Sequence, residues 1–312
     1  MIENPLIQQR ELLAGKAIAK LDRIVIEITG EDRLSWLHNM LSQNILNASV
    51  GQSLEALLLD AQGHVLADVH LMIQTDAVIG ILSDAESEAL LDWFQKAKFR
   101  SKVAWQILDV QVYGSWGASV SQQSWQDRWP HQVAGGHRYG KVSAEPWEYF
   151  ENLGYQGDFE VVPESAIDAL RIAAHRPSFN EIDEKTLPHE LELLATAVHL
   201  TKGCYRGQET VAKVHNLGHP PRRLVMLHLD GSGHLLPEVG STVSFNSVSK
   251  GRVTSVGQHH EMGPIALAVI SRSVPEDATL EIDSVAATQE VIVPASAGAT
   301  VERRTVPKKS LL

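Results

Sequence analysis

The sequence predicts an α+β protein that ends in a small all-β barrel. Up to about residue 112, strand-like and helix-like patterns alternate in the order strand, helix, strands, helix, strand. This order favours a mixed α+β sandwich over a doubly wound parallel sheet. Beyond residue 221 the apolar runs are short and separated by Gly or Pro, which is typical of a small barrel or sandwich. A chain of 312 residues suits two or three packed lobes better than one core.

The first expected lobe covers residues 1–112 and begins with a half-buried strand at 24–29. Apolar residues at helical spacing then predict a helix that continues to Ile45. Two further strands, 54–59 and 65–74, are separated by the turn sequence D-A-Q-G, which is typical of a hairpin. The sequence therefore predicts that these elements share one sheet.

The strand at 65–74 carries the polar residues that matter most in this lobe. Its alternation leaves Asp68 and His70 on the face opposite to its Val and Ala side chains. A strand at 78–82 leads to Asp84, which we expect to cap the next helix at its N-terminus. One long strand at 103–112 is expected to close the lobe.

The second expected lobe covers residues 113–217. Residues 113–150 show no clear period and suggest loops and short strands with aromatic anchors. The anchors are Trp116, Trp125, Trp129 and Trp147. Apolar spacing predicts one helix at 166–175 and a second from Pro188 to just before Gly203.

The third expected lobe is a C-terminal β-barrel at residues 218–290, entered through the linker G-H-P-P. Consecutive prolines cannot continue a helix or a central strand, so the chain should change direction there. Residues 291–312 show no sustained period and are expected to form a flexible tail. Its basic residues are Arg303, Arg304, Lys308 and Lys309.

Composition excludes several classes of function. The formal net charge of −11 repels a phosphate backbone, so direct nucleic-acid binding is not expected. The single cysteine excludes an internal disulfide framework and fits a reducing cytosol. No apolar run is long enough for a membrane span, and the N-terminus lacks a signal-peptide core. These observations predict a cytoplasmic protein without a membrane partner.

The densest reactive segment is K-G-C-Y-R-G-Q-E, residues 202–209. Two glycines bracket Cys204 and allow a tight turn that holds the sulfur outside regular structure. Lys202 and Arg206 flank it, and a nearby cation favours the thiolate, which is a nucleophile and a soft-metal ligand. We therefore treat these three residues as the catalytic candidates. The alternative is a buried cysteine that acts only as a small apolar side chain.

This segment closely resembles the K-G-C-Y-x-G-Q-E signature of the YgfZ family, which are folate-binding relatives of the glycine-cleavage T-protein. The resemblance extends over most of the chain, through residues 28–32, 59–68, 154–160, 170–174, 187–190 and 251–255. It implies three lobes, two of them α+β around a central folate-sized cavity and the third a C-terminal β-barrel. It also implies binding of tetrahydrofolate or a one-carbon derivative, and support for the assembly or repair of iron–sulfur enzymes. One such client enzyme in bacteria methylthiolates tRNA.

The resemblance also implies the folate-binding residues. Asp68 lies at the position of the T-protein's folate-facing acid, although Ala67 replaces the second acid of that family. Glu160 and Arg171 lie at positions that contact the pterin and its neighbourhood, because a carboxylate or a guanidinium can pair with a planar polar ring. Tyr205 completes the folate-binding candidates.

Each candidate also has an ordinary structural interpretation. Asp68 could be a solvated strand residue, Glu160 a charge at a sheet edge, and Arg171 a helix surface residue. His70 is more often a structural histidine than a base. His175, at the end of the predicted helix, replaces a glycine that is usual in the family.

Two rival functions remain open. The first is a true aminomethyltransferase, which would pass a one-carbon unit from a lipoyl-borne aminomethyl group to tetrahydrofolate. T-proteins resemble K-x-D-F-I-G at the cysteine segment and need no thiol there. The second is a cysteine hydrolase, which would need a base and an orienting group beside the sulfur.

Two weaker features complete the candidates. Cys204, His215 and His219 have a spacing that lacks a fourth ligand, so no metal site is predicted from them. Lys213, Arg222 and Arg223 could form the one basic patch on an acidic chain.

Overall fold

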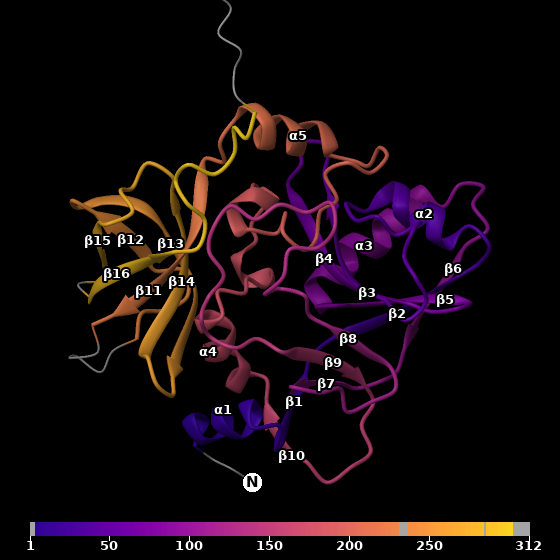
Figure 1. The fold of residues 1–312 in the computed structure, drawn as a ribbon, viewed down its shortest axis with the longest axis horizontal. Coiled ribbons are helices and arrows are strands. Elements are labelled where there is room, and N and C mark those ends of the chain that lie inside the picture. The colour runs from indigo at the N-terminus through magenta and orange to yellow at the C-terminus, as the bar shows by residue number, and fades with distance from the viewer. Residues whose placement is uncertain (1–3, 231–235, 284, 302–312) are drawn as a thin grey trace, which may run out of the picture.

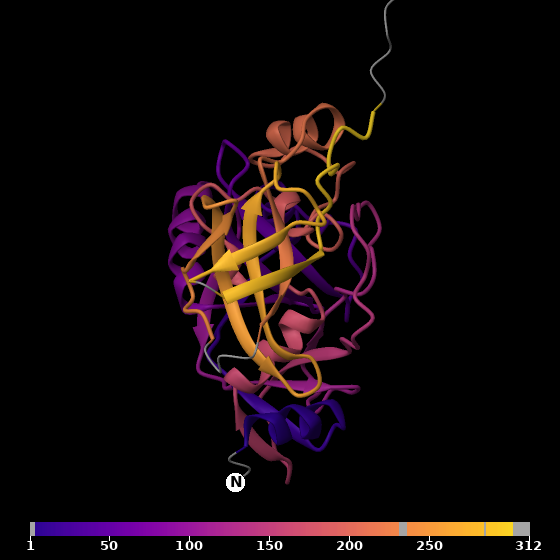
Figure 2. The same ribbon diagram turned by 90° about the vertical axis from the view of Figure 1, so that its left-hand side faces the viewer.

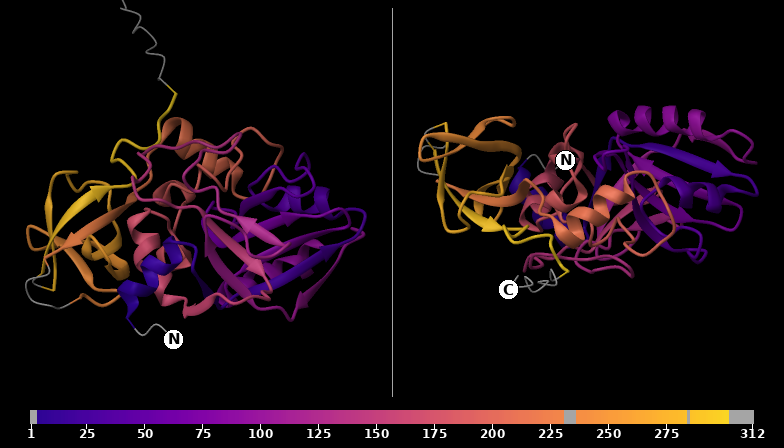
Figure 3. Two further views of the ribbon diagram at one scale, coloured as in Figure 1. Left: turned by 60° about the horizontal axis from the view of Figure 1, so that its bottom comes forward. Right: turned by 90° about the horizontal axis from the view of Figure 1, so that it is seen from above.

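The computed structural model describes residues 4–230, 236–283 and 285–301, and these form two five-stranded sheets and a closed barrel. Figure 1 shows the barrel on one side, the first sheet with its helices on the other, and the second sheet with α4 between them. Figure 3 shows the same arrangement from two further directions. The predicted α+β class with a C-terminal barrel is confirmed.

The first sheet is antiparallel and carries helices on one face. Its strands, in spatial order, are β3 (Ser53–Leu59), β4 (Val65–Ile73), β5 (Ala77–Leu82), β2 (Ile24–Thr29) and β6 (Ala104–Leu108). Helices α2 (Arg33–Met40) and α3 (Asp84–Ala97) enclose a core with this face. The hairpin of β3 and β4 forms as predicted, and Asp68 and His70 lie on the opposite face, toward the second sheet.

The second sheet combines strands from distant parts of the chain. Its strands, in spatial order, are β10 (Glu160–Pro163), β1 (Ala17–Leu21), β7 (Val112–Trp116), β9 (Tyr149–Leu153) and β8 (Ser124–Gln126). Strand β1 comes from the N-terminus and pairs with β10 in parallel and with β7 in antiparallel orientation. The predicted tryptophan anchors Trp116, Trp125, Trp129 and Trp147 are all buried in this core.

The barrel closes with the strands β11 (Arg222–Leu229), β14 (Gly263–Ser271), β13 (Val248–His259), β12 (Thr242–Phe245), β15 (Thr279–Ile282) and β16 (Val285–Val291). Figure 2 views the barrel from its own side. Helix α4 (Ser165–Ala173) packs against β13 and thereby joins the barrel to the centre of the molecule. Gly257 of β13 makes this approach possible, because a Cβ there would lie 2.9 Å from the Cα of Ala169.

The helix predicted from Pro188 to Gly203 is wrong. Only a short 3-10 turn, Pro188–Leu191, forms, and Glu192 then adopts a left-handed φ of 64° that ends it. The apolar residues that follow are buried on all sides and their backbone is bonded through turns. Apolar spacing alone does not distinguish such a buried coil from a helix.

Three other boundaries differ from the prediction. The expected single strand at 103–112 is two strands, because the chain leaves β6 and enters β7 of the second sheet. Helix α2 ends at Met40, since Leu41 is extended, and Ile45 is buried in the following loop. Ser83 rather than Asp84 is the N-cap of α3, and it forms a capping box with Glu86.

The sequence patterns did not predict several elements: α1 (Pro5–Leu13), β1, α5 (Gln208–Leu217) and β16. His175 adopts a φ of 61°, the left-handed conformation that the family's glycine would favour. Of the expected tail, residues 292–301 include the buried Ile292 and Val293, whereas residues 302–312 lie outside the described residues. That excluded segment contains the basic side chains named above.

The expected basic patch does not form. Arg223 is fully buried in the barrel, and Arg222 pairs with Asp183 at 2.6 Å and with Glu190 at 2.7 Å. Only Lys213 of the three is exposed. No helix within the described ranges is long and apolar enough to cross a membrane.

Candidate functional site

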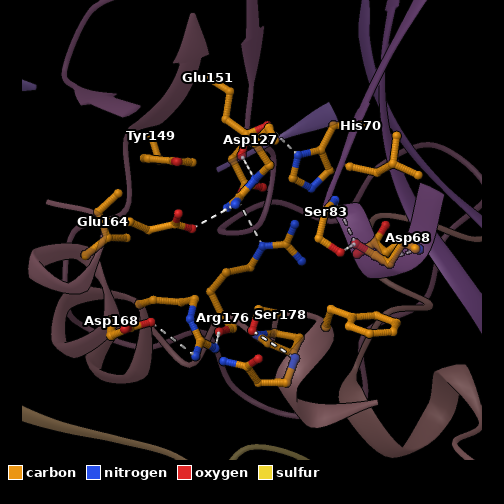
Figure 4. A pocket seen from close by; sticks show the side chains of 18 of the residues that line it. Asp68, His70, Ser83, Asp127, Tyr149, Glu151, Glu164, Asp168, Arg176 and Ser178 are labelled. Atoms are coloured by element: carbon orange, nitrogen blue, oxygen red, sulfur yellow. Dashed lines mark hydrogen bonds and ion pairs between the residues drawn. The ribbon is translucent and has the colours of Figure 1, made fainter. Parts of the chain in front are cut away.

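A cavity of about 170 Å³ lies where the two sheets meet the segment that follows α4. Strand β4 contributes Asp68 and His70, strand β9 contributes Glu151, and the end of α4 and the next residues contribute Arg171 and Arg176. Figure 4 shows Asp68, His70, Glu151 and Arg176 around this space. The cavity is therefore lined by charged side chains from three separate parts of the chain.

His70 is held in one orientation by two contacts. Its Nδ1 lies 2.8 Å from Oε2 of Glu151, and its ring stacks on Trp125 with the centroids 3.7 Å apart. Burial raises the pKa of Glu151, but His70 and Arg23 outweigh this effect and hold the pKa at about 2. Glu151 is therefore ionised and accepts a hydrogen bond from Nδ1–H of His70. These two contacts give His70 the structural role of the ordinary interpretation. Its ring also forms part of the cavity wall.

Arg176 is a buried hub between the sheets. Its guanidinium pairs with Glu55 of β3 at 2.7 Å and with Asp127 at 2.9 Å. It also lies over the ring of Trp129, 5.1 Å from the centroid. Burial disfavours the charged guanidinium, but Asp127 and Glu55 outweigh it and raise the pKa of Arg176. One guanidinium therefore neutralises two buried carboxylates only in part.

Asp68 is the candidate that offers an unused polar atom to the cavity. Its backbone N–H donates to Glu86 at 2.7 Å, whereas its buried Oδ1 has no hydrogen-bond partner among the described residues. Burial, and next the carboxylate of Glu55, raise the pKa of Asp68 well above its usual value. Asp68 is therefore not the fully solvated strand residue of the ordinary interpretation, because one of its carboxyl oxygens is buried.

Arg171 and Glu160 are placed differently. Arg171 lines the cavity and is buried, but it donates to Glu181 at 3.0 Å and to Ser255 of β13 at 2.6 Å. These bonds tie α4 to the barrel, so Arg171 is not an ordinary surface residue. Glu160 begins the edge strand β10 and is not among the residues that line the cavity. The structure thus brings Asp68 and Arg171 together and leaves Glu160 apart.

The cysteine segment forms a loop between the first sheet and α5, and the thiol of Cys204 is exposed. The loop is fixed at Gly207, whose φ is 81° and where a Cβ would lie 2.7 Å from the carbonyl of Asp60. Tyr205 is buried beneath the loop, and its hydroxyl has no partner among the described residues. The alternative of a buried, inert cysteine is excluded by this exposure.

The two cations beside Cys204 have other partners. Lys202 is buried and donates to the carbonyl oxygens of His38, Leu41 and Gln43. Burial lowers the pKa of Lys202 to about 8. Arg206 stacks on Trp93 of α3, 4.1 Å from the ring centroid. Lys202 therefore anchors the loop to the residues after α2, and Arg206 anchors it to α3.

Cys204 is not among the residues that line the cavity of Asp68. The Cys204, His215 and His219 combination does not assemble either. His215 bonds the hydroxyl of Tyr139 at 2.7 Å, and His219 bonds the carbonyl of Ala297 at 2.7 Å. Neither histidine joins Cys204 in a metal-ligating group within the described ranges. The candidate thiol and the candidate folate cavity are thus separate places on the molecule.

Sequence reasoning missed Glu55, Asp127, Glu151 and Arg176. One signal was available: Glu55 is the single acid in the otherwise apolar strand S-L-E-A-L-L-L. It also lines a second cavity of about 380 Å³ on the other side of Trp125. Asp127 and Arg176 come from irregular segments, and the sequence of such segments does not predict where a side chain lies in the fold.

Comparisons with known proteins agree with this architecture. No family model matches the chain. The chain is 24% identical to the tRNA-modifying protein YgfZ of Vibrio atlanticus, covering 84% of this chain and 85% of that protein. It is 23% identical to the mitochondrial iron-sulfur cluster assembly factor IBA57 homolog of Coccidioides immitis, covering 85% and 73%. It is 22% identical to a putative chloroplastic transferase of Arabidopsis thaliana, covering 79% of this chain but only 63% of that relative.

A solved structure has the same fold. The glycine cleavage system aminomethyltransferase T of Bartonella henselae superposes with a TM-score of 0.72 at 17% identity, covering 94% of this chain and 89% of that one. The chain therefore shares the aminomethyltransferase T fold. Its sequence is similar to YgfZ and IBA57 proteins, and these relatives support a place among the YgfZ/IBA57-like proteins.

Proposed function

We propose that this protein is a folate-binding accessory factor for the assembly or repair of iron–sulfur enzymes, including one that modifies tRNA by methylthiolation. The observation that carries the proposal is the exposed thiol of Cys204 in a loop that Lys202 and Arg206 hold through contacts inside the protein. The names of the YgfZ and IBA57 relatives support the same role. The partners would be iron–sulfur client proteins.

The cavity of Asp68 fits one end of a folate. Ligand pockets typically enclose about 300–1,000 Å³, so a space of about 170 Å³ would hold the pterin ring and leave the remainder of the folate at the mouth. The carboxyl group of Asp68, which lines the cavity, would supply the polar contact that a pterin edge needs. A one-carbon derivative of tetrahydrofolate, when bound, would supply the one-carbon unit that it carries, whereas tetrahydrofolate itself would accept one. Arg171 would position the cavity wall through Glu181 and Ser255 rather than donate to the ligand.

Cys204 would act on the client rather than on the folate, because it lies outside the cavity lining. An exposed cysteine can bind iron of a client transiently, since a thiolate is a soft ligand. Tyr205 supports the loop from below, and Lys202 and Arg206 hold its two ends. These three residues would therefore position the thiol.

The aminomethyltransferase alternative rests on the shared fold. Transfer of an aminomethyl group needs a carboxylate that positions and protonates the departing amine. This chain has Ala67 beside Asp68 and an exposed cysteine loop some distance from that acid's cavity. With an aminomethyl-lipoyl carrier and tetrahydrofolate, we expect ammonia release at background rate. Turnover that disappears in Asp68→Asn would favour the transferase.

Calorimetry with tetrahydrofolate tests the folate part of the proposal. We expect wild type and Cys204→Ser to bind alike, and Asp68→Asn to bind at least tenfold more weakly, because the last variant changes the polar group of the cavity. Equal affinity of all three, or no binding to wild type at millimolar folate, would contradict the assignment.

Complementation tests the thiol part. Cys204→Ser should stay within about 1 kcal/mol of wild-type stability, since the side chain is exposed and oxygen is close in size to sulfur. It should nevertheless fail to restore iron–sulfur enzyme activity in cells that lack the protein. Ser273→Ala, an exposed change on the barrel, is the control that should complement fully. Full complementation by Cys204→Ser would refute a role for the thiol.

A further inference from the structure

We propose that Glu55, Asp68 and His70 form a binding site for one divalent metal ion of the Mn²⁺ or Fe²⁺ class. Their ligand atoms, two carboxylate oxygens and one imidazole nitrogen, lie within 4.8 Å of one another. This inference is independent of the thiol and adds a metal to the cavity for which folate binding is proposed above.

The register of the β3–β4 hairpin brings the three side chains together. Glu55 on β3 lies directly opposite His70 on β4, and Asp68 is two residues from His70 on the same strand. Side chains at opposite and at alternate positions share one face of a sheet. The ligands are therefore held by regular strands, which fix their positions more firmly than loops would.

His70 is oriented as metal-binding histidines usually are. Its Nδ1 bonds to the buried carboxylate of Glu151 at 2.8 Å, which leaves Nε2 with its lone pair available. Stacking on Trp125 prevents the ring from turning away. A carboxylate behind the imidazole is the partner that metal-binding histidines commonly have.

The two carboxylates have unused oxygen atoms. Glu55 is only 4% exposed, and neither of its buried oxygens has a hydrogen bond of good geometry among the described residues, although the side chains of Asp68 and Thr196 interact with its carboxylate. Oε1 has an ion pair with Arg176, and that guanidinium is shared with Asp127. Oδ1 of Asp68 is also buried and without a hydrogen-bond partner among the described residues. Buried charges of this kind are costly unless a cation or a donor satisfies them.

The ligand types select the metal class. Two carboxylates and one imidazole, with no thiolate, suit Mn²⁺ or Fe²⁺ and disfavour a structural zinc site. Because Asp68 and His70 line the cavity, the remaining coordination positions would face it and be available to water or a ligand. Arg176 lies on the Glu55 side and also pairs with Asp127, so the divalent ion and Arg176 together would balance the three carboxylates of Glu55, Asp68 and Asp127.

Titration with Mn²⁺ followed by electron paramagnetic resonance tests the site. We expect one Mn²⁺ per wild-type chain in folate-free protein, with a modulation from an imidazole nitrogen in spin-echo spectra. Asp68→Asn and Glu55→Gln should each weaken Mn²⁺ binding by more than tenfold, and His70→Asn should also abolish the nitrogen modulation. Asp92→Asn is the matched control, because Asp92 is an exposed acid of α3 that pairs with Lys96.

If Glu55→Gln fails to fold, Asp68→Asn decides the outcome. Asn has the same size as Asp, and it replaces a carboxyl group that has one oxygen without a hydrogen-bond partner among the described residues. Wild type that binds no Mn²⁺ at millimolar concentration overturns the inference. Binding that is unchanged in Asp68→Asn and His70→Asn also overturns it. Folate affinity measured in the presence of a chelator is a separate readout, so failure of the metal site and failure of the folate site are distinguishable.

Discussion

Replacement of Glu192 by Gln should change how stability depends on pH. Glu192 follows the 3-10 turn, is 1% exposed, and accepts hydrogen bonds from the backbone N–H groups of Tyr139 and Gly140. Burial outweighs these bonds and the nearby Arg138, and raises the pKa of Glu192 from 4.5 to about 7. The folded protein therefore holds a proton that the unfolded chain releases at lower pH.

The sign and size follow from linkage. Below about pH 4.5 the carboxyl is protonated in both states, and above about pH 7 it is ionised in both, so stability falls as the pH rises between these values. At about 1.4 kcal/mol for each pH unit, the loss is about 3 kcal/mol, of which about 2.5 kcal/mol falls between pH 5 and pH 8. Gln carries no charge and avoids this loss.

Urea unfolding of wild type and Glu192→Gln at pH 5, 6, 7 and 8 measures the effect. The stability of the variant minus that of wild type should rise by about 2.5 kcal/mol over this range. Any cost of placing an amide against two N–H donors is independent of pH and cancels. Glu184→Gln, at a side chain that is 85% exposed, should show no such rise. A change below about 0.5 kcal/mol for Glu192→Gln would refute the reasoning.

Two further substitutions test the packing around the site. Arg176→Met should destabilise the fold by about 3–5 kcal/mol in chemical denaturation, because it leaves two buried carboxylates unpaired; a loss no larger than that of the exposed Arg100→Met would contradict this. Gly207→Ala should lower the melting temperature more than Gly117→Ala. Both glycines have positive φ, but only at Gly207 would the Cβ clash, with the carbonyl of Asp60 at 2.7 Å, whereas Gly117 has open space. Equal losses would show that the loop relaxes.

The fold was predictable where periodicity and turn chemistry agree. The β3–β4 hairpin and the face that carries Asp68 and His70 follow from strict alternation and from the D-A-Q-G turn. The barrel strands follow from short apolar runs between glycines and prolines. By contrast, the coil after Pro188 reads as a helix, because burial on all sides removes the contrast between an apolar and a polar face.

The site was predictable only in part, because its charged members meet through tertiary packing. Cys204 was singled out from its own segment, and the structure shows that its thiol is exposed, while its reactive role stays a prediction. Arg171 lies at the cavity, but no pattern shows that its donors are used by Glu181 and Ser255 across the barrel interface. Arg176 sits between strands that are distant in sequence, so its role appears only in the folded chain.

The central claim is that the cavity of Asp68 binds reduced folate while Cys204 acts at a separate surface. A crystal structure of the protein with tetrahydrofolate tests this most directly. The account predicts the pterin in the cavity with a polar edge within hydrogen-bond distance of the Asp68 carboxyl, and the Cys204 thiol free of contact with the ligand. A folate held against Cys204, or in the second cavity beside Gln43 and Thr196, would contradict the claim.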